Sequence, residues 1–337
     1  MRIAFLSAAC SIHTVRWVNA LADRGHEIAL FSLLRHADKM GSISQKITVY
    51  YLRGGYLSAT QAFSRELAAF SPQVLNAHYA TGYGTLARRS RFNPLLLSIW
   101  GSDIYDFPHF GPIHRHIVVK NLRAADAIAS TSQRMADRAR LLYAHENIFI
   151  TPFGVDTHLF SPSMKRTPKN TVTIGIVKAL EPKYGVEFLL RAFALLVARL
   201  PAINLQLIFC GSGSQEDKLK RISKKLEIED RVRFLGAVSH REVPNVLRKF
   251  DIFCVPSVLD SESFGVAAVE AMACALPVVA GAVDGFKEVM QDGQTGYLAI
   301  PESGTDLADK LENLVVIPES REQMGASGRK NSIRRFD

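Results

Sequence analysis

Hydrophobic positions in the first half of the chain form short apolar runs that alternate with stretches of helical periodicity. The runs predict strands at residues 2–7, 27–32, 73–78, 95–100, 127–130 and 148–151. The stretches between them repeat apolar residues at helical spacing and predict helices at residues 14–24, 60–70, 85–91, 113–124 and 132–144. Strands that alternate with helices of this length indicate βα units, so we expect a parallel sheet.

The pattern stops at residues 160–170 (FSPSMKRTPKN), which are rich in Pro, Ser and Lys and lack periodicity, as expected of a linker. A second series follows, with strands predicted at residues 172–177, 204–210, 232–235, 252–255 and 277–280, and helices at 186–199, 215–226, 243–249 and 264–273. We therefore predict an α/β protein of two Rossmann-like, doubly wound domains, residues 1–162 and 163–337, facing across a cleft. Ligands of such sheets bind beyond the carboxyl ends of the strands, so the cleft is the expected site.

Composition agrees with two packed domains, because 337 residues usually exceed one core and 47% hydrophobic residues exclude disorder. The apolar residues 264–283 are long enough to suggest a membrane span, but they include Glu270 and Pro277. A buried charge at that depth is unfavourable in a bilayer, so we expect a buried helix followed by a buried strand. The first ten residues predict a strand rather than a signal peptide.

Four cysteines are scattered along the chain without metal-binding spacing, which is typical of reduced thiols and favours a cytoplasmic location. They are Cys10, Cys210, Cys254 and Cys274.

Basic residues are concentrated in the first half. Residues 1–165 contain 18 Lys and Arg against 10 Asp and Glu, whereas residues 166–337 contain 23 against 22. An excess confined to one half indicates an anionic partner there: nucleic acid, an anionic membrane or a phosphate-bearing substrate. No helix-turn-helix, zinc-finger or RNA-recognition signature accompanies the excess, so nucleic acid is not expected. Ordinary solubilising charge is the alternative.

Two glutamates eight residues apart, Glu262 and Glu270, mark the strongest chemical signal. Eight helical residues advance about 12 Å and rotate by about 80° beyond two turns, so both carboxylates can face one side. Between them, the N–H groups of Phe264, Gly265 and Val266 would lie at a helix N-terminus, which favours phosphate. The arrangement suits a ligand with hydroxyls at both ends and charge between them. Alternatively, Glu270 is a buried structural residue with a basic partner.

Residues 261–280 (SESFGVAAVEAMACALPVVA), preceded by 251–257 (DIFCVPS), resemble the signature of retaining GT-B glycosyltransferases of glycosyltransferase family 4, the group 1 glycosyl transferases. Further segments are similar to motifs of that family in the same order. They are residues 153–156 (FGVD) with 160–162 (FSP), 178–185 (KALEPKYG), 210–213 (CGSG), 234–236 (FLG) and 292–298 (DGQTGYL). The resemblance covers nearly the whole chain.

The resemblance implies a donor site for a nucleotide sugar in the second domain. Glu270 would hold the ribose hydroxyls, and Glu262 the hydroxyls of the donor sugar. Further donor contacts are implied at Gly211, Val238, Ser263, Phe264, Gly265 and Val266.

A basic pair in the family neutralises the diphosphate leaving group, which implies catalysis without a metal or other cofactor. Lys178 stands where the family has Arg. The family's Lys directly precedes the glycine, where this chain has Tyr184, and Lys183 is the nearer match. Lysine keeps the charge but lacks the bidentate fork of arginine. Two surface lysines without a role are the alternative.

The match is looser in the first half of the chain. Many relatives have a glycine-rich loop after the first strand, where residues 7–14 (SAACSIHT) stand here, and His13 is a candidate in that loop. Trp100 occupies a position that is often His in relatives. Asp103, beside it at the carboxyl end of a predicted strand, is either a polar group near the reaction centre or a helix or turn cap. Relatives usually continue past Phe336 into a helix that crosses back to the first domain, so the crossover is expected to be missing or truncated here.

The resemblance implies a retaining glycosyltransferase that moves a hexose or N-acetylhexosamine from a nucleotide diphosphate sugar, UDP-sugar first and GDP-sugar next. The acceptor would be a glycan or a lipid-linked glycan of cell-surface polysaccharide assembly. The acceptor would attack from the front face, its proton passing to the leaving phosphate, so no protein nucleophile is expected. The alternatives are a GT-B-fold epimerase or phosphorylase and a non-catalytic nucleotide-sugar-binding subunit.

Basic clusters in the first half predict peripheral association with the inner face of the cell membrane. The apolar neighbours Leu86, Ile117 and Val118 would complete an amphipathic surface. The clusters consist of Arg88, Arg89 and Arg91, and of His114, Arg115, His116, Lys120 and Arg123. A solvated basic face on an enzyme with a soluble acceptor is the alternative.

Overall fold

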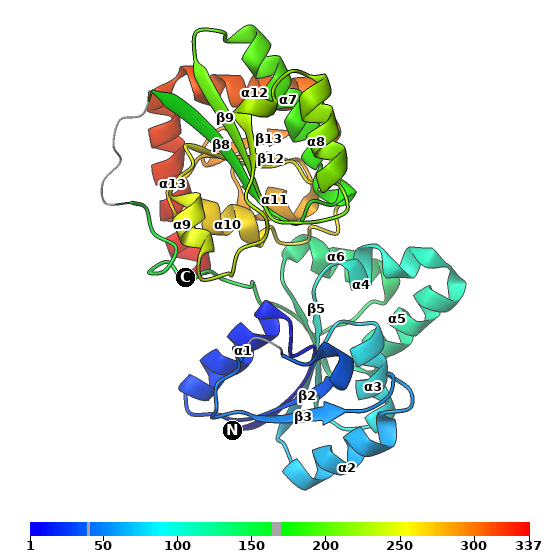
Figure 1. The fold of residues 1–337 in the computed structure, drawn as a ribbon. Helices are drawn as coiled ribbons and strands as arrows, with labels where there is room; N and C mark the ends of the chain where they lie inside the picture. Colours follow the sequence, from blue (N-terminus) through cyan, green and yellow to red (C-terminus); the bar gives the residue numbers. More distant parts are fainter. Residues whose placement is uncertain (39–40, 164–169) are drawn as a thin grey trace. The chain divides into compact units, whose positions relative to one another are not determined.

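The computed structural model describes residues 1–38, 41–163 and 170–337. These residues form two compact units, Met1–Pro152 (unit 1) and Phe153–Asp337 (unit 2). Each unit has its own parallel sheet with helices on both faces (Figure 1). The two-domain α/β architecture predicted from the sequence is confirmed.

The sheet of unit 1 has seven strands in the order β3-β2-β1-β4-β5-β6-β7. Every pairing between these strands is parallel. The strands are β1 (Arg2–Leu6), β2 (Glu27–Leu33), β3 (Thr48–Leu52), β4 (Val74–His78), β5 (Leu95–Ile99), β6 (Ala127–Ser130) and β7 (Ile148–Ile150). The strand order reverses between β1 and β4, which makes their carboxyl ends the switch point of this sheet.

Helices cover the two faces of this sheet with separate apolar clusters. On one face, Val18 and Ala22 of α1 (Ile12–Asp23) pack against Phe5 and Leu30. The other face is covered by α2 (Thr60–Phe70), α3 (Gly82–Ser90), α5 (Pro112–Ala124) and α6 (Gln133–Leu142). Figure 1 shows α1 and α3 on opposite sides of the strands. The short α4 (Ser102–Tyr105) and the 3-10 turns η1 (Leu34–His36) and η2 (Phe107–Phe110) lie in loops.

Unit 2 repeats this topology with six parallel strands in the order β10-β9-β8-β11-β12-β13. Its strands are β8 (Thr171–Val177), β9 (Asn204–Cys210), β10 (Val232–Phe234), β11 (Ile252–Val255), β12 (Val278–Gly281) and β13 (Gly296–Ala299). The order reverses between β8 and β11, which therefore form the switch point of unit 2.

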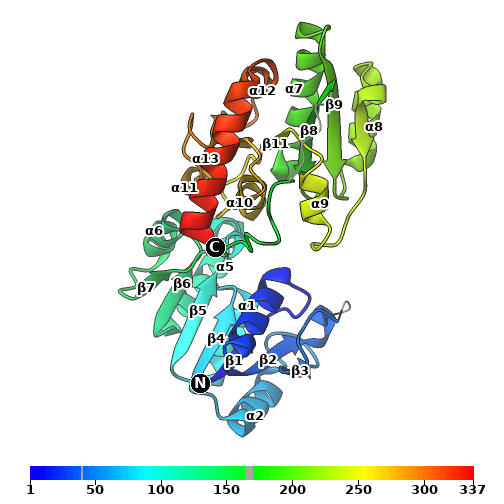
Figure 2. The same ribbon diagram turned by 90° about the vertical axis from the view of Figure 1, so that its left-hand side faces the viewer.

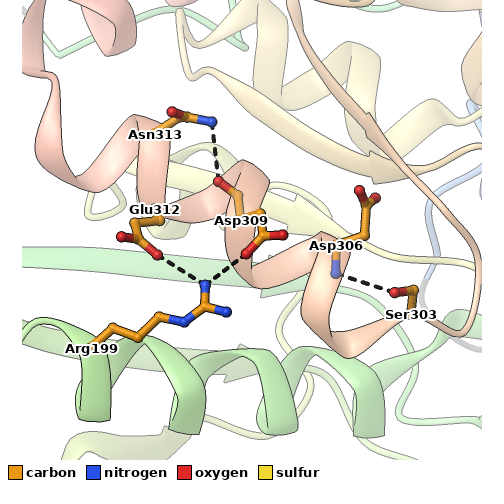
Figure 3. A network of polar contacts seen from close by, with 6 residues as sticks. All are labelled: Arg199, Ser303, Asp306, Asp309, Glu312 and Asn313. Carbon is orange, nitrogen blue, oxygen red and sulfur yellow. Dashed lines mark hydrogen bonds and ion pairs between the residues drawn. The ribbon is translucent and has the colours of Figure 1, made fainter.

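Two layers of helices enclose the second sheet. One face packs against α7 (Val186–Arg199), α8 (Glu216–Lys225) and α12 (Gly304–Val316). The other packs against α9 (Val243–Leu247), α10 (Val266–Ala273) and α11 (Asp284–Val289). The 3-10 turns η3 (Pro182–Tyr184) and η4 (Glu229–Arg231) connect elements of the unit. Polar contacts tie α7 to α12: Arg199 Nη1 lies 2.7 Å from Asp309 Oδ1 and 3.0 Å from Glu312 Oε2 (Figure 3).

The last helix, α13 (Pro318–Phe336), lies along α10 within unit 2 (Figure 2). The C-terminal end of α13 binds the first residues of unit 2, because Val155 N–H donates to Phe336 O at 2.7 Å. Phe160 is 1% exposed and belongs to the same core cluster. These contacts explain why unit 2 begins at Phe153, whereas the sequence pattern predicts a domain boundary after Pro162. Residues 164–169 of the predicted linker lie outside the described residues.

All eleven predicted strands are present, and the apolar stretch 264–283 is a buried helix followed by a buried strand. The edge strands β3 and β13 were not predicted from the sequence. The helix expected from residue 264 begins at Val266, since Gly265 adopts φ +79°. Glu262 therefore lies in the loop before α10, and the helical spacing argument applies only to residues 266–270.

Candidate functional site

The switch point of unit 2 gathers most of the donor-site residues expected from the sequence. Lys178 directly follows β8, Gly211 follows β9, and Glu262 lies in the loop after β11. Gly211 has φ +143°, and a Cβ there would collide with the carbonyl oxygen of Lys178. Only glycine allows these two strand ends to approach so closely, so the backbone geometry itself positions Lys178.

Lys178 and Glu262 form a shielded ion pair, with 2.5 Å between Nζ and Oε2. The two side chains are only 17% and 11% exposed. Burial by itself lowers the pKa of Lys178, but the neighbouring carboxylate of Glu262 and the nearby Tyr184 and Glu270 raise the pKa above its ordinary value. Lys178 is therefore charged at neutral pH.

The ring of Tyr184 contacts both lysines that are expected to face the diphosphate. Lys178 Nζ lies 4.5 Å from the centroid of this ring, and Lys183 Nζ lies 4.9 Å from the same centroid. Such distances are typical of cation–π contacts. Lys183 is itself exposed. Its backbone carbonyl accepts from Val258 N–H at 3.0 Å, which ties the lysine-bearing turn to the loop that contains Glu262.

The N-terminus of α10 presents backbone to the same switch point. Gly265 caps the helix, and a Cβ on it would clash with the ring of Phe286. Ser263 and Phe264 are buried, whereas Val266 is half-buried. The first N–H groups of a helix have no acceptor within the helix, so this end is suited to bind an anion.

Glu270 is buried in α10 and meets His240, which follows β10. His240 Nε2 lies 2.8 Å from Glu270 Oε1. The structure thus supplies the basic partner that the alternative interpretation of Glu270 required, so burial of this carboxylate does not by itself indicate a ligand. Val238, in the same loop as His240, is half-buried against the cluster that contains Phe264.

The switch point of unit 1 carries neutral polar groups. His78, the last residue of β4, is 2% exposed, and its Nδ1 lies 2.9 Å from the hydroxyl of Ser7 after β1. The Ser7 hydroxyl lies 2.7 Å from that of Thr14 in α1. Burial, aided by the nearby His13, lowers the pKa of His78 to about 3, so its ring is neutral at physiological pH.

Trp100 lies beside this network in a cluster of rings at the end of β5. Its ring centroid is 4.4 Å from that of His78, 5.8 Å from that of His13 and 5.9 Å from that of Tyr79. His13, the candidate in the loop after β1, and Trp100 are therefore neighbours. An aromatic surface of this kind can pack against the carbon face of a ring-shaped, hydroxyl-bearing molecule.

Asp103 is fully buried and serves the backbone. Its Oδ1 accepts from the N–H groups of Trp100 and Gly101 at 3.1 and 2.8 Å, and its Oδ2 accepts from Ala80 N–H at 2.8 Å. Burial raises the pKa of Asp103, and these N–H donors oppose the rise. Of the two roles left open by the sequence, this geometry favours the turn cap, which fixes the backbone that carries Trp100.

Comparison with known proteins decides the family. A family model described as glycosyl transferases group 1 matches residues 161–331, and one described as glycosyl transferase 4-like matches residues 2–132. The chain belongs to the group 1 glycosyl transferases. The resemblance noted in the sequence is confirmed.

Curated relatives of this glycosyltransferase cover almost its full length. It is 28% identical to a D-inositol 3-phosphate glycosyltransferase of Stackebrandtia nassauensis, over 96% of this chain and 82% of that protein. It is 27% identical to a protein of the same name from Actinosynnema mirum, over 94% and 86% of the two chains.

Solved structures show that the fold is GT-B. Anabaena HepE in complex with UDP and glucose matches with a TM-score of 0.84 at 20% identity, over 100% of this chain and 96% of that one. Sucrose-phosphate synthase from Thermosynechococcus elongatus matches with a TM-score of 0.84 at 21% identity, over 100% and 95%.

The described residues of this glycosyltransferase contain neither a cluster of metal-ligating side chains nor a membrane-spanning helix. Across residues 1–38, 41–163 and 170–337, no group of three or more His, Cys, Asp and Glu side chains is placed to hold a metal ion. Within the same ranges, no helix has the length and apolar character needed to cross a bilayer.

Three residues at the two switch points were missed by sequence analysis: His78, Tyr184 and His240. His78 ends a predicted strand, so the position at a strand's carboxyl end that drew attention to Asp103 could also have found it. Tyr184 was noted only as a departure from the family's lysine. His240 lies 30 residues from Glu270, and nothing in the sequence alone joins the two.

Proposed function

We propose that this glycosyltransferase transfers a hexose or N-acetylhexosamine from a nucleotide diphosphate sugar to a hydroxyl-bearing acceptor, with retention of anomeric configuration. The observation that carries the proposal is the shielded Lys178–Glu262 pair at the switch point of unit 2, beside the N-terminus of α10. Structural neighbours bound to UDP, or to UDP-glucose, support UDP-sugars as the first donors to test, with GDP-sugars next.

In the proposed donor complex, Lys178 and Lys183 stabilise the charge that develops on the leaving diphosphate. The N–H groups at the start of α10 bind the phosphates, Glu262 the hydroxyls of the sugar, and Glu270 those of the ribose. The acceptor attacks from the face that the diphosphate leaves, and its proton passes to the leaving phosphate. Because two lysines supply the positive charge, we propose that turnover requires no metal.

We propose an acceptor that combines hydroxyls with a phosphate. Two observations support it: the basic excess of the first half of the chain, and relatives named for D-inositol 3-phosphate. A phosphorylated cyclitol and a phosphate-linked lipid glycan share this chemistry. The ring cluster of Trp100 and His13 would hold the carbon face of the accepting ring.

Transfer is tested with UDP-, GDP- and ADP-sugars in the presence of D-inositol 3-phosphate in one arm and a lipid-phosphate-linked glycan in the other. Mass spectrometry should detect a glycosylated product in one arm, which identifies the source of the phosphate. NMR of the product should show the anomeric configuration of the donor, and activity should survive EDTA. Binding without transfer in either arm contradicts the enzymatic proposal. An inverted product contradicts retention, and EDTA inactivation reversed by Mg²⁺ contradicts the lysine mechanism.

We further propose that unit 1 associates with anionic membranes through the N-terminal end of α5. Leu86 and Val118, expected to complete an amphipathic surface, are instead buried in the core. The exposed apolar residues are Phe110 and Ile113, 70% and 74% exposed. They lie at the start of α5, whose first turns carry the exposed Arg115 and His116, and the exposed Lys120 and Arg123 follow farther along the helix. Apolar side chains next to cations are typical of surfaces that bind anionic lipid.

Co-sedimentation with vesicles tests this surface. The protein should pellet with phosphatidylserine-containing vesicles more than with neutral ones, and binding should fall at about 0.5 M salt because the charges are screened. A Phe110→Ser, Ile113→Ser variant should pellet less, whereas a Leu159→Ser control, exposed on unit 2, should behave as wild type. Equal pelleting with both kinds of vesicle removes the proposal.

A further inference from the structure

The loop after β10 brings His240 against the carboxylate of Glu270. The contact joins His240 Nε2 to Glu270 Oε1 at 2.8 Å. An ionised carboxylate can only accept hydrogen bonds, so the hydrogen must lie on Nε2 of His240. The Glu270 side chain is 8% exposed and that of His240 is 31% exposed, so the contact is shielded on the carboxylate side and open toward solvent on the imidazole side.

The imidazole is held from a second direction. Its ring centroid lies 5.4 Å from that of Phe160, which is 1% exposed. Two arginines fix the backbone around Phe160: Arg329 Nη1 donates to Phe160 O at 3.3 Å, and Arg248 Nε donates to Ser161 O at 2.9 Å. His240 is therefore a fixed donor rather than a mobile surface side chain.

A fixed donor on Oε1 sets the plane of the Glu270 carboxylate. It leaves Oε2 and the second lone pair of Oε1 to accept from ligand hydroxyls. A carboxylate accepts two neighbouring hydroxyls well only when both of its oxygens are correctly oriented, because hydrogen bonds weaken steeply away from linear geometry. Glu262 is positioned in a comparable way, because Lys178 Nζ contacts one of its two carboxylate oxygens, Oε2.

We propose that His240 is a positioning residue that orients Glu270 and thereby determines the preference of the donor site for ribose over 2′-deoxyribose. The inference rests on the proposed function, in which Glu270 binds the ribose hydroxyls. His240 acts through Glu270, so its loss affects recognition of the sugar hydroxyls rather than of the diphosphate.

Calorimetric titration of UDP and 2′-deoxy-UDP tests the proposal. GDP and 2′-deoxy-GDP replace them if the wild type binds GDP more tightly. A hydrogen bond between a hydroxyl and a charged group corresponds to a preference of about 10- to 100-fold, which we expect of the wild type. His240→Leu, which keeps an apolar contact with Phe160, should reduce the preference to about threefold or less. His240→Gln, whose amide N–H can replace Nε2, should retain most of it.

Two controls separate this inference from the proposed function. Arg241→Ala changes an exposed neighbour in the same loop and should keep the wild-type preference. Glu270→Gln should lose it. If His240→Leu keeps the wild-type preference for the ribonucleotide while Glu270→Gln loses it, His240 does not position Glu270 for ribose. The proposed function then stands. If the wild type binds none of these nucleotides, both are wrong.

Discussion

In unit 2 the strand order reverses beside a half-buried lysine and two carboxylates, whereas at the same place in unit 1 the side chains are hydroxyls, a neutral imidazole and an indole. Both sheets have their first strand in the middle and the same succession of neighbours. The fold therefore provides the same edge twice, and the residues just beyond the strands decide what each edge can bind. Charge suits a diphosphate, and a neutral aromatic surface suits the carbon face of a hydroxyl-bearing ring.

The charged edge of unit 2 depends on charge pairing, whereas the edge of unit 1 does not. Lys178 and Glu262 are charged and shielded from water, so each depends on the other, and removing either leaves a buried charge without its partner. In unit 1, His78 avoids that penalty by remaining neutral. The charged edge should therefore be far more sensitive to substitution than the neutral edge.

The largest expected effect is at the charged edge. Lys178→Ala should lower kcat by at least about 10²-fold, because the developing charge on the leaving group loses a preorganised partner. Steady-state kinetics with saturating donor measure the loss. Lys218→Ala, which removes a half-exposed lysine paired with Glu187, serves as the control and should change kcat by less than twofold. A loss of kcat of less than about tenfold in Lys178→Ala would show that Lys178 does not stabilise the leaving diphosphate.

At the neutral edge, Trp100→Ala should raise the acceptor KM by about tenfold and leave the donor Kd unchanged, because truncation of a central aromatic contact costs roughly 1–2 kcal/mol. Separate titrations of donor and acceptor provide the measurement. Tyr51→Ala, which truncates an exposed aromatic residue on the edge strand β3 of the same sheet, provides the control, and its acceptor KM should remain close to that of the wild type. A higher donor Kd in Trp100→Ala would contradict the assignment of the donor to unit 2 alone.

Tyr184 should give a smaller effect at the charged edge. Tyr184→Leu removes the ring that two lysines share, and we expect a three- to tenfold lower kcat with an unchanged melting temperature. Tyr184→Phe keeps the ring and should retain activity. The control Tyr297→Leu disrupts an equivalent contact with Lys310 and should be neutral in kinetics. Equal losses in the Phe and Leu variants would assign the effect to the hydroxyl instead of the ring.

The smallest effect concerns stability against acid. The pKa of folded His78 is about 3, below the ordinary 6.5, so between these values the unfolded chain binds a proton that the folded chain does not. The stabilisation from neutral His78 is complete above pH 6.5 and declines as the pH falls toward 3. Urea unfolding of His78→Gln should therefore depend less on pH between 6.5 and 4.5 than that of the wild type. The exposed His116→Gln should keep the wild-type slope, and a wild-type slope in His78→Gln would contradict the assignment.

The sequence predicted the parallel sheets because their buried strands are strongly apolar, and it predicted Lys178, Glu262 and Glu270 because the motif around them is distinctive. It did not predict β3, nor β13, most of which lies in the segment 292–298 that was assigned to a family motif. Nor did it pair His240 with Glu270, because that contact depends on how two loops meet in three dimensions. The role of Asp103 could be decided between its alternatives only when its three backbone donors were located.

We infer that the charged edge of unit 2 binds the donor and that the neutral edge of unit 1 does not. Isothermal titration of UDP-, GDP- and ADP-sugars into the wild type, Lys178→Ala and Trp100→Ala tests it most directly. We predict that at least one nucleotide sugar binds the wild type and Trp100→Ala with the same Kd, and that Lys178→Ala weakens this binding by tenfold or more. Equal weakening by the two substitutions, or unchanged binding in Lys178→Ala, would contradict the claim.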